Sequence, residues 1–223
     1  MICVIPVRGG SKGVPGKNLR TTSSGKTLLA QAIEKARAVC GNRVTVLADT
    51  DELAQHAERA GAWDVWRDGR NTPDFEDVSV RLAAWKRERP VNPGGIVVLL
   101  QCTSPNVSRE TLAQFVDAAR RLNSGEALLA VSPLNKKPNA LFEIGGDGSL
   151  RPLNPIAPAV TFPRQALPPA WWFCGALSAF YKDAIDRGKP SVFSGLKLIP
   201  FFIPEHEASD IDREEDFPNG ENN

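Results

Sequence analysis

The sequence IPVRGGSKGVPGKNLR, residues 5–20, combines four glycines with four cations directly after a short apolar run. Glycine lets backbone N–H groups approach a phosphate closely, and Arg8, Lys12 and Lys17 supply positive charge. The spacing is neither the GxxxxGK[ST] of a Walker loop nor the GxGxxG of a dinucleotide-binding loop. The alternative is a solvated surface turn with incidental lysines. The position of the segment directly after an apolar strand disfavours that alternative. We therefore interpret this segment as a phosphate-binding loop.

Two carboxylates near the other end of the chain, Asp210 and Asp212, could hold a metal ion. Alternate residues of an extended segment point to the same side, so both carboxylates can share a hard cation such as Mg²⁺. A solvated acidic turn is the alternative, and a phosphate loop elsewhere in the chain favours the metal. Asp49 and Asp51 are weaker metal candidates, since helix capping by Asp51 explains them equally well.

The composition excludes several classes of function. Lys and Arg total 27 against 26 Asp and Glu, so we expect binding neither to nucleic acid nor to a membrane surface. No apolar run approaches the roughly 20 residues of a spanning helix, and no signal-peptide pattern precedes the first apolar run. Four scattered cysteines without a CxxC pair are typical of free thiols in a reducing compartment. We therefore expect a cytoplasmic protein.

The elements that must position these residues follow from the hydrophobic periodicity. Segments with strand character alternate with segments of helical period, which predicts an α/β fold with a mostly parallel sheet flanked by helices. The predicted strands are residues 2–7, 43–49, 94–101 and 127–132, and the predicted helices are residues 26–39, 51–61, 77–88 and 108–122.

The alternation stops at residues 134–170, which hold many prolines and a GGDGS turn suited to a hairpin. We interpret this segment as an inserted arm. Strands are predicted again at residues 171–181 and 196–204, followed by a helix at 210–217 and a disordered tail at 218–223. The prediction is a single domain over residues 1–217.

Several sequence blocks resemble the CMP-sugar-acid synthetases, especially the acylneuraminate cytidylyltransferases. IPVRGGSKGVPGKNL is similar to their signature IPARGGSKGIPGKN. Further similar blocks follow in the family's order over nearly the whole chain: GKTLLAQAIEKA, ADTDELAQHAERAGA, VVLLQCTSP, RQALP and SDIDREEDF.

The resemblance implies a Rossmann-like nucleotidyltransferase fold whose inserted arm dimerises. It implies that an acidic acceptor attacks the α-phosphorus of CTP and releases pyrophosphate, and that the protein is a homodimer in which Arg164 approaches the neighbouring subunit's site. Matched to the family's motifs, Arg8, Lys12 and Lys17 are the predicted catalytic cations. The other predicted nucleotide-binding residues are Gly9, Gly10, Ser11, Asn18 and Ser79. Gln101 is predicted to reach the acceptor or the nucleotide, and Asp210 and Asp212 are predicted to bind Mg²⁺.

The part of the sequence matched to the acceptor site departs from the family pattern. TSPNV replaces TSPLR, Ala140 stands where the family has a lysine, and Cys174 replaces an asparagine. Lys136 and Lys137 could supply the missing cation, and we assign them to the acceptor with Gln101 and Arg164. Trp171 and Trp172 are either core or dimer-interface aromatics.

These departures leave two acceptors open. A sialic-type nonulosonic acid is the leading acceptor, and a small phosphonate such as phosphonoformate is the alternative. Two other classes of function compete with both: a nucleotide-binding protein without catalysis, and a nucleotidyltransferase for ATP or GTP. The intact cations and carboxylates oppose the first. The second usually has a shorter, LAGGxSxRMG-like loop.

Overall fold

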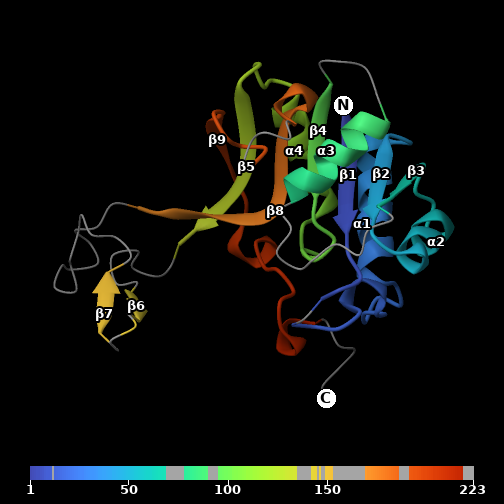
Figure 1. The fold of residues 1–223 in the computed structure, drawn as a ribbon, viewed down its shortest axis with the longest axis horizontal. Coiled ribbons are helices and arrows are strands. Elements are labelled where there is room, and N and C mark those ends of the chain that lie inside the picture. The colour runs from blue at the N-terminus through green and yellow to red at the C-terminus, as the bar shows by residue number, and fades with distance from the viewer. Residues whose placement is uncertain are drawn as a thin grey trace.

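In the computed structural model, a mostly parallel sheet lies between helices (Figure 1). The structure describes residues 1–11, 13–68, 78–89, 95–134, 142–144, 146, 149–152, 169–185 and 191–217. Within these residues, seven strands form one sheet in the order β3-β2-β1-β4-β8-β5-β9. The strands are β1 (Ile2–Val7), β2 (Val44–Ala48), β3 (Asp64–Arg67), β4 (Ile96–Leu100), β5 (Glu126–Pro133), β8 (Trp171–Tyr181) and β9 (Lys197–Phe202).

The pairing confirms the predicted parallel sheet. β1 is parallel to β2 and β4, β2 to β3, and β5 to β9, whereas β8 runs antiparallel between β4 and β5. Strands covered on both faces favour apolar residues, which explains why β1 and β4 are continuous apolar runs and why β2 is apolar except at Thr45. β3, an edge strand, was not predicted, because its sequence DVWR is short and half polar.

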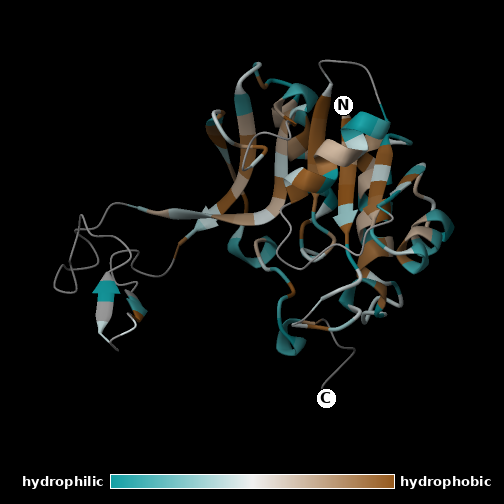
Figure 2. Ribbon diagram, viewed as in Figure 1, coloured by the Kyte–Doolittle hydropathy of each residue, from teal (hydrophilic) through white to brown (hydrophobic). Residues whose placement is uncertain are grey.

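Helices cover both faces of the sheet. The helices are α1 (Leu28–Cys40), α2 (Asp51–Arg59), α3 (Val78–Glu88) and α4 (Arg109–Ala119). The apolar faces of α1, α2 and α4 share one buried cluster with one face of the sheet, and α3 packs on the opposite face. Figure 2 shows hydrophobic residues concentrated on the central strands and hydrophilic residues on the outer helical surfaces. Among the described residues, no helix combines the length and apolar character needed to cross a bilayer.

Hydroxyl side chains begin three of these helices. Thr27, Thr50 and Ser108 accept hydrogen bonds from the backbone N–H groups of Ala30, Leu53 and Thr111, respectively. The capping interpretation of Asp51 was therefore wrong, because Thr50 is the N-cap of α2 and Asp51 lies in its first turn.

The last part of the chain also differs from the prediction. In place of a helix over 210–217, the structure has one short 3-10 helix, η6 (Glu214–Asp216). Residues 209–212 before it are in neither helix nor strand, and the Ile211 N–H donates to the Thr103 carbonyl at 2.9 Å. This contact holds the segment across the carboxyl end of β4, where helical winding would break it.

The predicted insertion contains a hairpin, as the GGDGS turn indicated. β6 (Phe142–Ile144) and β7 (Leu150–Pro152) pair antiparallel and stand apart from the main sheet in Figure 1. The prolines between residues 153 and 168 and the tail at 218–223 lie outside the described residues. The single-domain boundaries and the dimerising role of the arm stay predictions.

Candidate active site

A pocket of about 310 Å³ lies at the carboxyl ends of β1 and β4. Open α/β sheets bind ligands at this edge. The residues that line the pocket are Pro6, Val7, Arg8, Ser11, Lys17, Asn18, Val78, Arg81, Gln101, Cys102, Thr103, Gly175, Asp210 and Asp212.

Seven predicted site residues meet in this pocket: Arg8, Ser11, Lys17, Asn18, Gln101, Asp210 and Asp212. Ser79 is not among the lining residues, and its hydroxyl accepts a hydrogen bond from the Val192 N–H at 3.0 Å. Gly9 and Gly10 are exposed residues of the loop beside the pocket. Lys12, Lys136, Lys137 and Arg164 lie outside the described residues, so their predicted roles stay predictions.

Several backbone amides of the glycine-rich loop donate hydrogen bonds within the protein, including those of Gly9 and Ser11. The Gly9 N–H donates to Asp49 Oδ1 at 2.9 Å, and the Ser11 N–H donates to the Gly9 carbonyl at 3.0 Å. Gly13 is needed for a different reason, since a Cβ there would lie 2.0 Å from the Asp212 carbonyl oxygen. The glycines at 9 and 13 therefore serve close packing of the loop, and its positive charge comes from side chains.

Lys17 joins the loop to the segment that carries the two aspartates. It is buried in the short helix η1 (Lys17–Leu19), and its ammonium donates to the Ile211 carbonyl. The Lys17 Nζ also lies 3.7 Å from Asp212 Oδ1. The two ends of the chain thus place a cation beside the predicted metal ligands.

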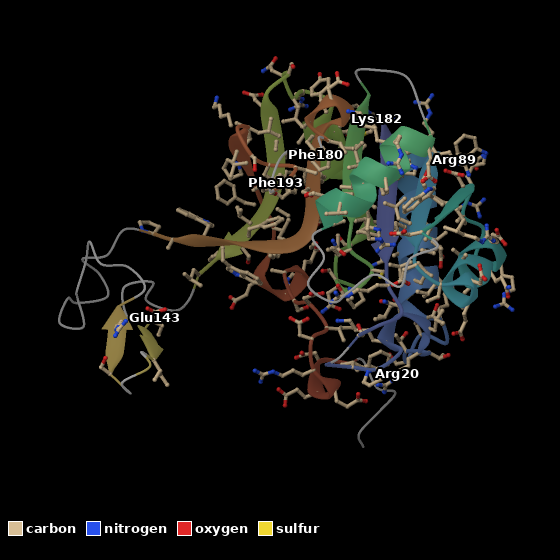
Figure 3. All side chains as sticks on the ribbon, in the orientation of Figure 1. Arg20, Arg89, Glu143, Phe180, Lys182 and Phe193 are labelled. Carbon is tan, nitrogen blue, oxygen red and sulfur yellow. The ribbon has the colours of Figure 1, made fainter. Side chains whose placement is uncertain are left out.

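A small buried cluster and an ion pair hold the same two segments together. The cluster consists of Val14, Leu28, Ile211 and Phe217. Arg20, labelled in Figure 3, forms two hydrogen bonds with the Glu214 carboxylate, at 2.7 and 2.6 Å, and lies 4.1 Å from the centre of the Phe217 ring. A bidentate pair of this kind fixes orientation as well as distance.

Asp210 and Asp212 differ in exposure. Burial raises the pKa of Asp210, a hydrogen bond from the Thr103 side chain opposes the rise, and the charge of Asp212 adds to it. The Asp212 side chain is 75% exposed. Half-buried negative charge beside a second carboxylate is stabilised by a cation.

The carboxylate pair fits a magnesium ion that takes its other ligands from elsewhere. The described residues hold no group of three or more His, Cys, Asp or Glu suited to a metal. Mg²⁺ is commonly bound by one or two carboxylates together with substrate phosphates and water. Asp210 and Asp212 would therefore be its protein ligands if a phosphate occupied the pocket.

Sequence reasoning did not assign the other seven lining residues to the site, and four of them are Arg81, Cys102, Thr103 and Gly175. Arg81 is buried on α3, and its guanidinium donates to the carbonyls of Val7 and Leu47 at 3.0 and 2.5 Å. Its Nε lies 3.8 Å from Asp68 Oδ2, and that carboxylate is also buried. A cation among the apolar residues of a predicted helix face was the available signal.

The two pocket-side cysteines have structural hydrogen bonds. Burial raises the pKa of Cys102 to about 12, and its thiol donates to Asn18 Oδ1 at 3.2 Å. Cys174, aligned with the family's acceptor-site asparagine, is buried and donates to the Ala130 carbonyl at 3.3 Å. The neighbouring Gly175 lines the pocket instead, with a φ of +76°.

The class of protein follows from the fold. The solved structure of a CMP:2-keto-3-deoxy-manno-octonic acid synthetase complexed with CTP matches it with a TM-score of 0.69 and 19% identity, covering 96% of this chain and 93% of the other. The fold is the Rossmann-like nucleotidyltransferase fold, as predicted.

The family follows from the sequence. The profile of the cytidylyltransferases matches residues 2–138, and the chain belongs to this family. The chain is 33% identical over 154 residues to the CMP-N,N'-diacetyllegionaminic acid synthase of Legionella pneumophila. The aligned region covers 67% of this chain and 65% of that protein. It is 29% identical over 130 residues to the 3-deoxy-manno-octulosonate cytidylyltransferase of Sodalis glossinidius, covering 58% of this chain and 50% of that protein. These matches confirm the resemblance to the CMP-sugar-acid synthetases, although they span only half to two thirds of the relatives' length.

Proposed function

We propose that this protein is a CTP-dependent cytidylyltransferase that transfers CMP to an acidic sugar and releases pyrophosphate. One observation carries the proposal: Arg8 and Lys17 from the first loop share a pocket with Asp210 and Asp212 from the end of the chain. The family membership supplies the nucleotide, since relatives are named for CMP-linked products or as cytidylyltransferases.

The reaction needs charge neutralisation and positioning more than covalent chemistry. An acceptor oxygen forms a bond to the α-phosphorus of CTP, and the bond from that phosphorus to the bridging oxygen breaks as pyrophosphate leaves. The cations Arg8 and Lys17 offset the negative charge of the triphosphate and of the leaving group. Asp210 and Asp212 would hold Mg²⁺, which neutralises and polarises phosphate oxygens.

A sialic-type nonulosonic acid is the acceptor that we propose. The two curated relatives are named for sugar acids, a diacetyllegionaminic acid and a deoxy-octulosonate. Gln101 and Thr103 present polar groups to the pocket beside the predicted metal site. The phosphonate alternative depends on Lys136 and Lys137, which lie outside the described residues.

We also propose that the protein is a homodimer joined through the arm. Large apolar side chains gather unburied on β8 and β9: Trp171, Trp172, Phe173, Leu198 and Phe202. Exposed apolar side chains gathered on neighbouring elements often mark a protein–protein contact. Entry of Arg164 into the partner's site and the cytoplasmic location stay predictions.

A pyrophosphate-release assay tests the activity and the acceptor together. ATP, GTP, UTP and CTP are each supplied with N,N'-diacetyllegionaminic acid, N-acetylneuraminic acid, 3-deoxy-manno-octulosonate and phosphonoformate, with Mg²⁺ present. We expect CTP to be used far better than the other nucleotides. With CTP, we expect turnover when the acceptor is a nonulosonic acid. Equal turnover with ATP would overturn the nucleotide assignment, and turnover with phosphonoformate alone would replace the acceptor.

The substitutions Ala140→Lys and Lys137→Ala sharpen the acceptor test. If the acceptor is a nonulosonic acid, the lysine added at 140 preserves or improves kcat/KM for it. If the acceptor is a phosphonate, Lys137→Ala lowers turnover most, because a small polyanion depends on nearby cations.

A further inference from the structure

One peptide group of the phosphate loop is held from both sides. The carbonyl of Arg8 accepts a hydrogen bond from Asn18 Nδ2 at 2.9 Å, and the N–H of Gly9 donates to Asp49 Oδ1 at 2.9 Å. These two atoms belong to the same planar amide, the bond between Arg8 and Gly9. Because that amide is rigid, bonds at both of its polar atoms fix the orientation of its plane.

The two side chains that hold this amide are themselves fixed. Asn18 is buried at 4% exposure, and its Oδ1 accepts the hydrogen bond from Cys102. Asp49 is buried at 7% exposure and directly follows β2, and the next residue, Thr50, caps α2. A strand end, a helix start and a buried thiol therefore hold the clamp in place.

The loop also packs closely on the turn that carries Asp49. A Cβ added at Gly9 would lie 3.1 Å from Thr50 Cγ2, which is tighter than ordinary van der Waals contact. Glycine is the residue with the largest freedom in the unfolded or unliganded loop. Close packing requires glycine at this position, so other groups must restrict the freedom that glycine brings to the loop.

We propose that Asp49 and Asn18 form a peptide clamp that presets the phosphate loop before a nucleotide binds. Both are positioning residues: they act through the Arg8–Gly9 amide on the direction in which Arg8 leaves the backbone. A loop already in its binding conformation loses less entropy when it binds a ligand. The consequence for catalysis rests on the proposed function, whereas the clamp itself does not.

A carboxylate at residue 49 suits this role. Burial raises the pKa of Asp49, and the hydrogen bond from Gly9 and the charge of Arg81 oppose that rise. Among the described residues, none forms a hydrogen bond with the buried Asp49 Oδ2. Burying an incompletely solvated carboxylate is unfavourable, and a charge-assisted bond to the loop offsets part of the penalty.

Hydrogen exchange at the Gly9 amide, measured by NMR on the ligand-free protein, tests the clamp directly. Gly9 is an exposed residue, so its protection depends on the bond to Asp49. We expect Asp49→Ala to speed exchange by about 10- to 100-fold, as for loss of a bond to a charged acceptor, and Asp49→Asn to retain most protection. The control Asp51→Ala removes an exposed carboxylate two residues away and leaves exchange unchanged. Unchanged Gly9 exchange in folded Asp49→Ala would overturn the proposal.

A second variant changes the hydrogen bond at the carbonyl side of the same amide, and the measurement is again the exchange rate of the Gly9 N–H. Asn18→Asp puts an acceptor where the Arg8 carbonyl needs a donor, so we expect faster Gly9 exchange there too. This measurement decides the question if Asp49→Ala fails to fold, and unchanged exchange in folded Asn18→Asp contradicts the clamp.

Kinetics then separate the clamp from a general structural role. Asp49→Ala and Asn18→Ala should each lower kcat/KM for CTP, and the double variant should lose about as much as the worse single variant, because both act on one amide. Asp49→Asn should retain most of the native kcat/KM for CTP. Losses that multiply in the double variant would contradict a shared clamp. Slow Gly9 exchange in a protein without CTP turnover would refute the proposed function and leave the clamp standing.

Discussion

The two halves of β8 are both rich in apolar residues and lie in different surroundings. Trp171, Trp172 and Phe173 at its start are 48%, 40% and 42% exposed, whereas residues 176–180 are all buried. Gly175, with a left-handed φ of +76°, separates the halves, and the register with β5 shifts at the same level, between Leu129 and Val131. In Figure 1 the first half extends with the end of β5 away from the helices.

Neighbouring elements, and not composition, decide which half is buried. The second half pairs with both β4 and β5, and Phe180 contacts Phe193 edge to face in the core (Figure 3). The first half pairs with β5 alone, and Trp171 contacts the exposed Phe202 on β9. The same strand thus contributes Gly175 to the pocket wall and an aromatic surface directly after the arm.

The largest effect that we expect is at the pocket end. Asp212→Asn removes one charge from the carboxylate pair predicted to bind the metal, and the size of the side chain hardly changes. The substitution should lower kcat about 10²-fold or more. The measurement is turnover at saturating CTP and Mg²⁺, with thermal unfolding as the check on folding. The control Glu215→Gln removes an exposed carboxylate from the same segment and should keep near-native turnover. Near-native turnover in folded Asp212→Asn would make these carboxylates structural.

At the arm end, polar substitution should separate the subunits. Trp171→Ser combined with Phe202→Ser removes the exposed aromatic pair, and apolar burial is the main driving force for such contacts. Light scattering should give the native protein twice the chain mass of 24.2 kDa, and the variant that chain mass itself.

Trp63→Ser is the matched control for the arm, because Trp63 is 65% exposed beside β3, at the opposite edge of the sheet. It should leave the mass of the native protein unchanged. A native protein that is already monomeric at assay concentration would contradict the homodimer.

The smallest effect that we expect is a difference in thiol reactivity between the buried cysteines and the partly exposed Cys40. Burial raises the pKa of Cys174 and brings that of Cys102 to about 12, whereas a hydrogen bond from Cys3 lowers the pKa of the partly exposed Cys40. The thiolate is the reactive form, so alkylation of Cys40 should accelerate as pH rises toward its lowered pKa. Cys102, with about one thiolate in 10⁴ at pH 8, should stay unmodified between pH 7 and 9.

Mass spectrometry after brief iodoacetamide treatment measures this order. Modification of Cys174 as fast as Cys40 in the native protein would show that Cys174, next to the Gly175 divider of β8, is open to solvent.

Local pattern predicted most of the fold. Alternating strand and helix periods located β1, β2, β4 and β5 with α1, α2, α3 and α4, because each of these elements buries a face whose spacing the sequence displays. β3 was not predicted because it is short and only partly buried. The helix predicted at 210–217 was wrong because the Ile211 N–H donates to the Thr103 carbonyl, more than 100 residues away, and not to a carbonyl of a helical turn.

The candidate site was predicted less completely. Seven of the predicted site residues lie together in the pocket, since the glycine and cation spacing of the first loop and the family motifs pointed to them, and their roles stay predictions. Ser79 was assigned to the nucleotide, and two residues later Arg81 lines the pocket instead, because helical phase within α3 decides which side chain reaches the sheet edge. Asp49 had no sequence signal for its contact with Gly9.

By itself, the sequence determined most of the elements of this protein, its glycine-rich loop and its family. Those properties depend on residue types at short spacing, which are read without knowing what folds against them. Only the tertiary structure decided that Lys17 contacts Ile211, that Asp49 and Asn18 hold one amide, and that half of β8 is exposed. The first of these contacts joins residues 194 positions apart. Such contacts depend on how the sheet and helices pack, and side-chain identity alone does not specify that packing.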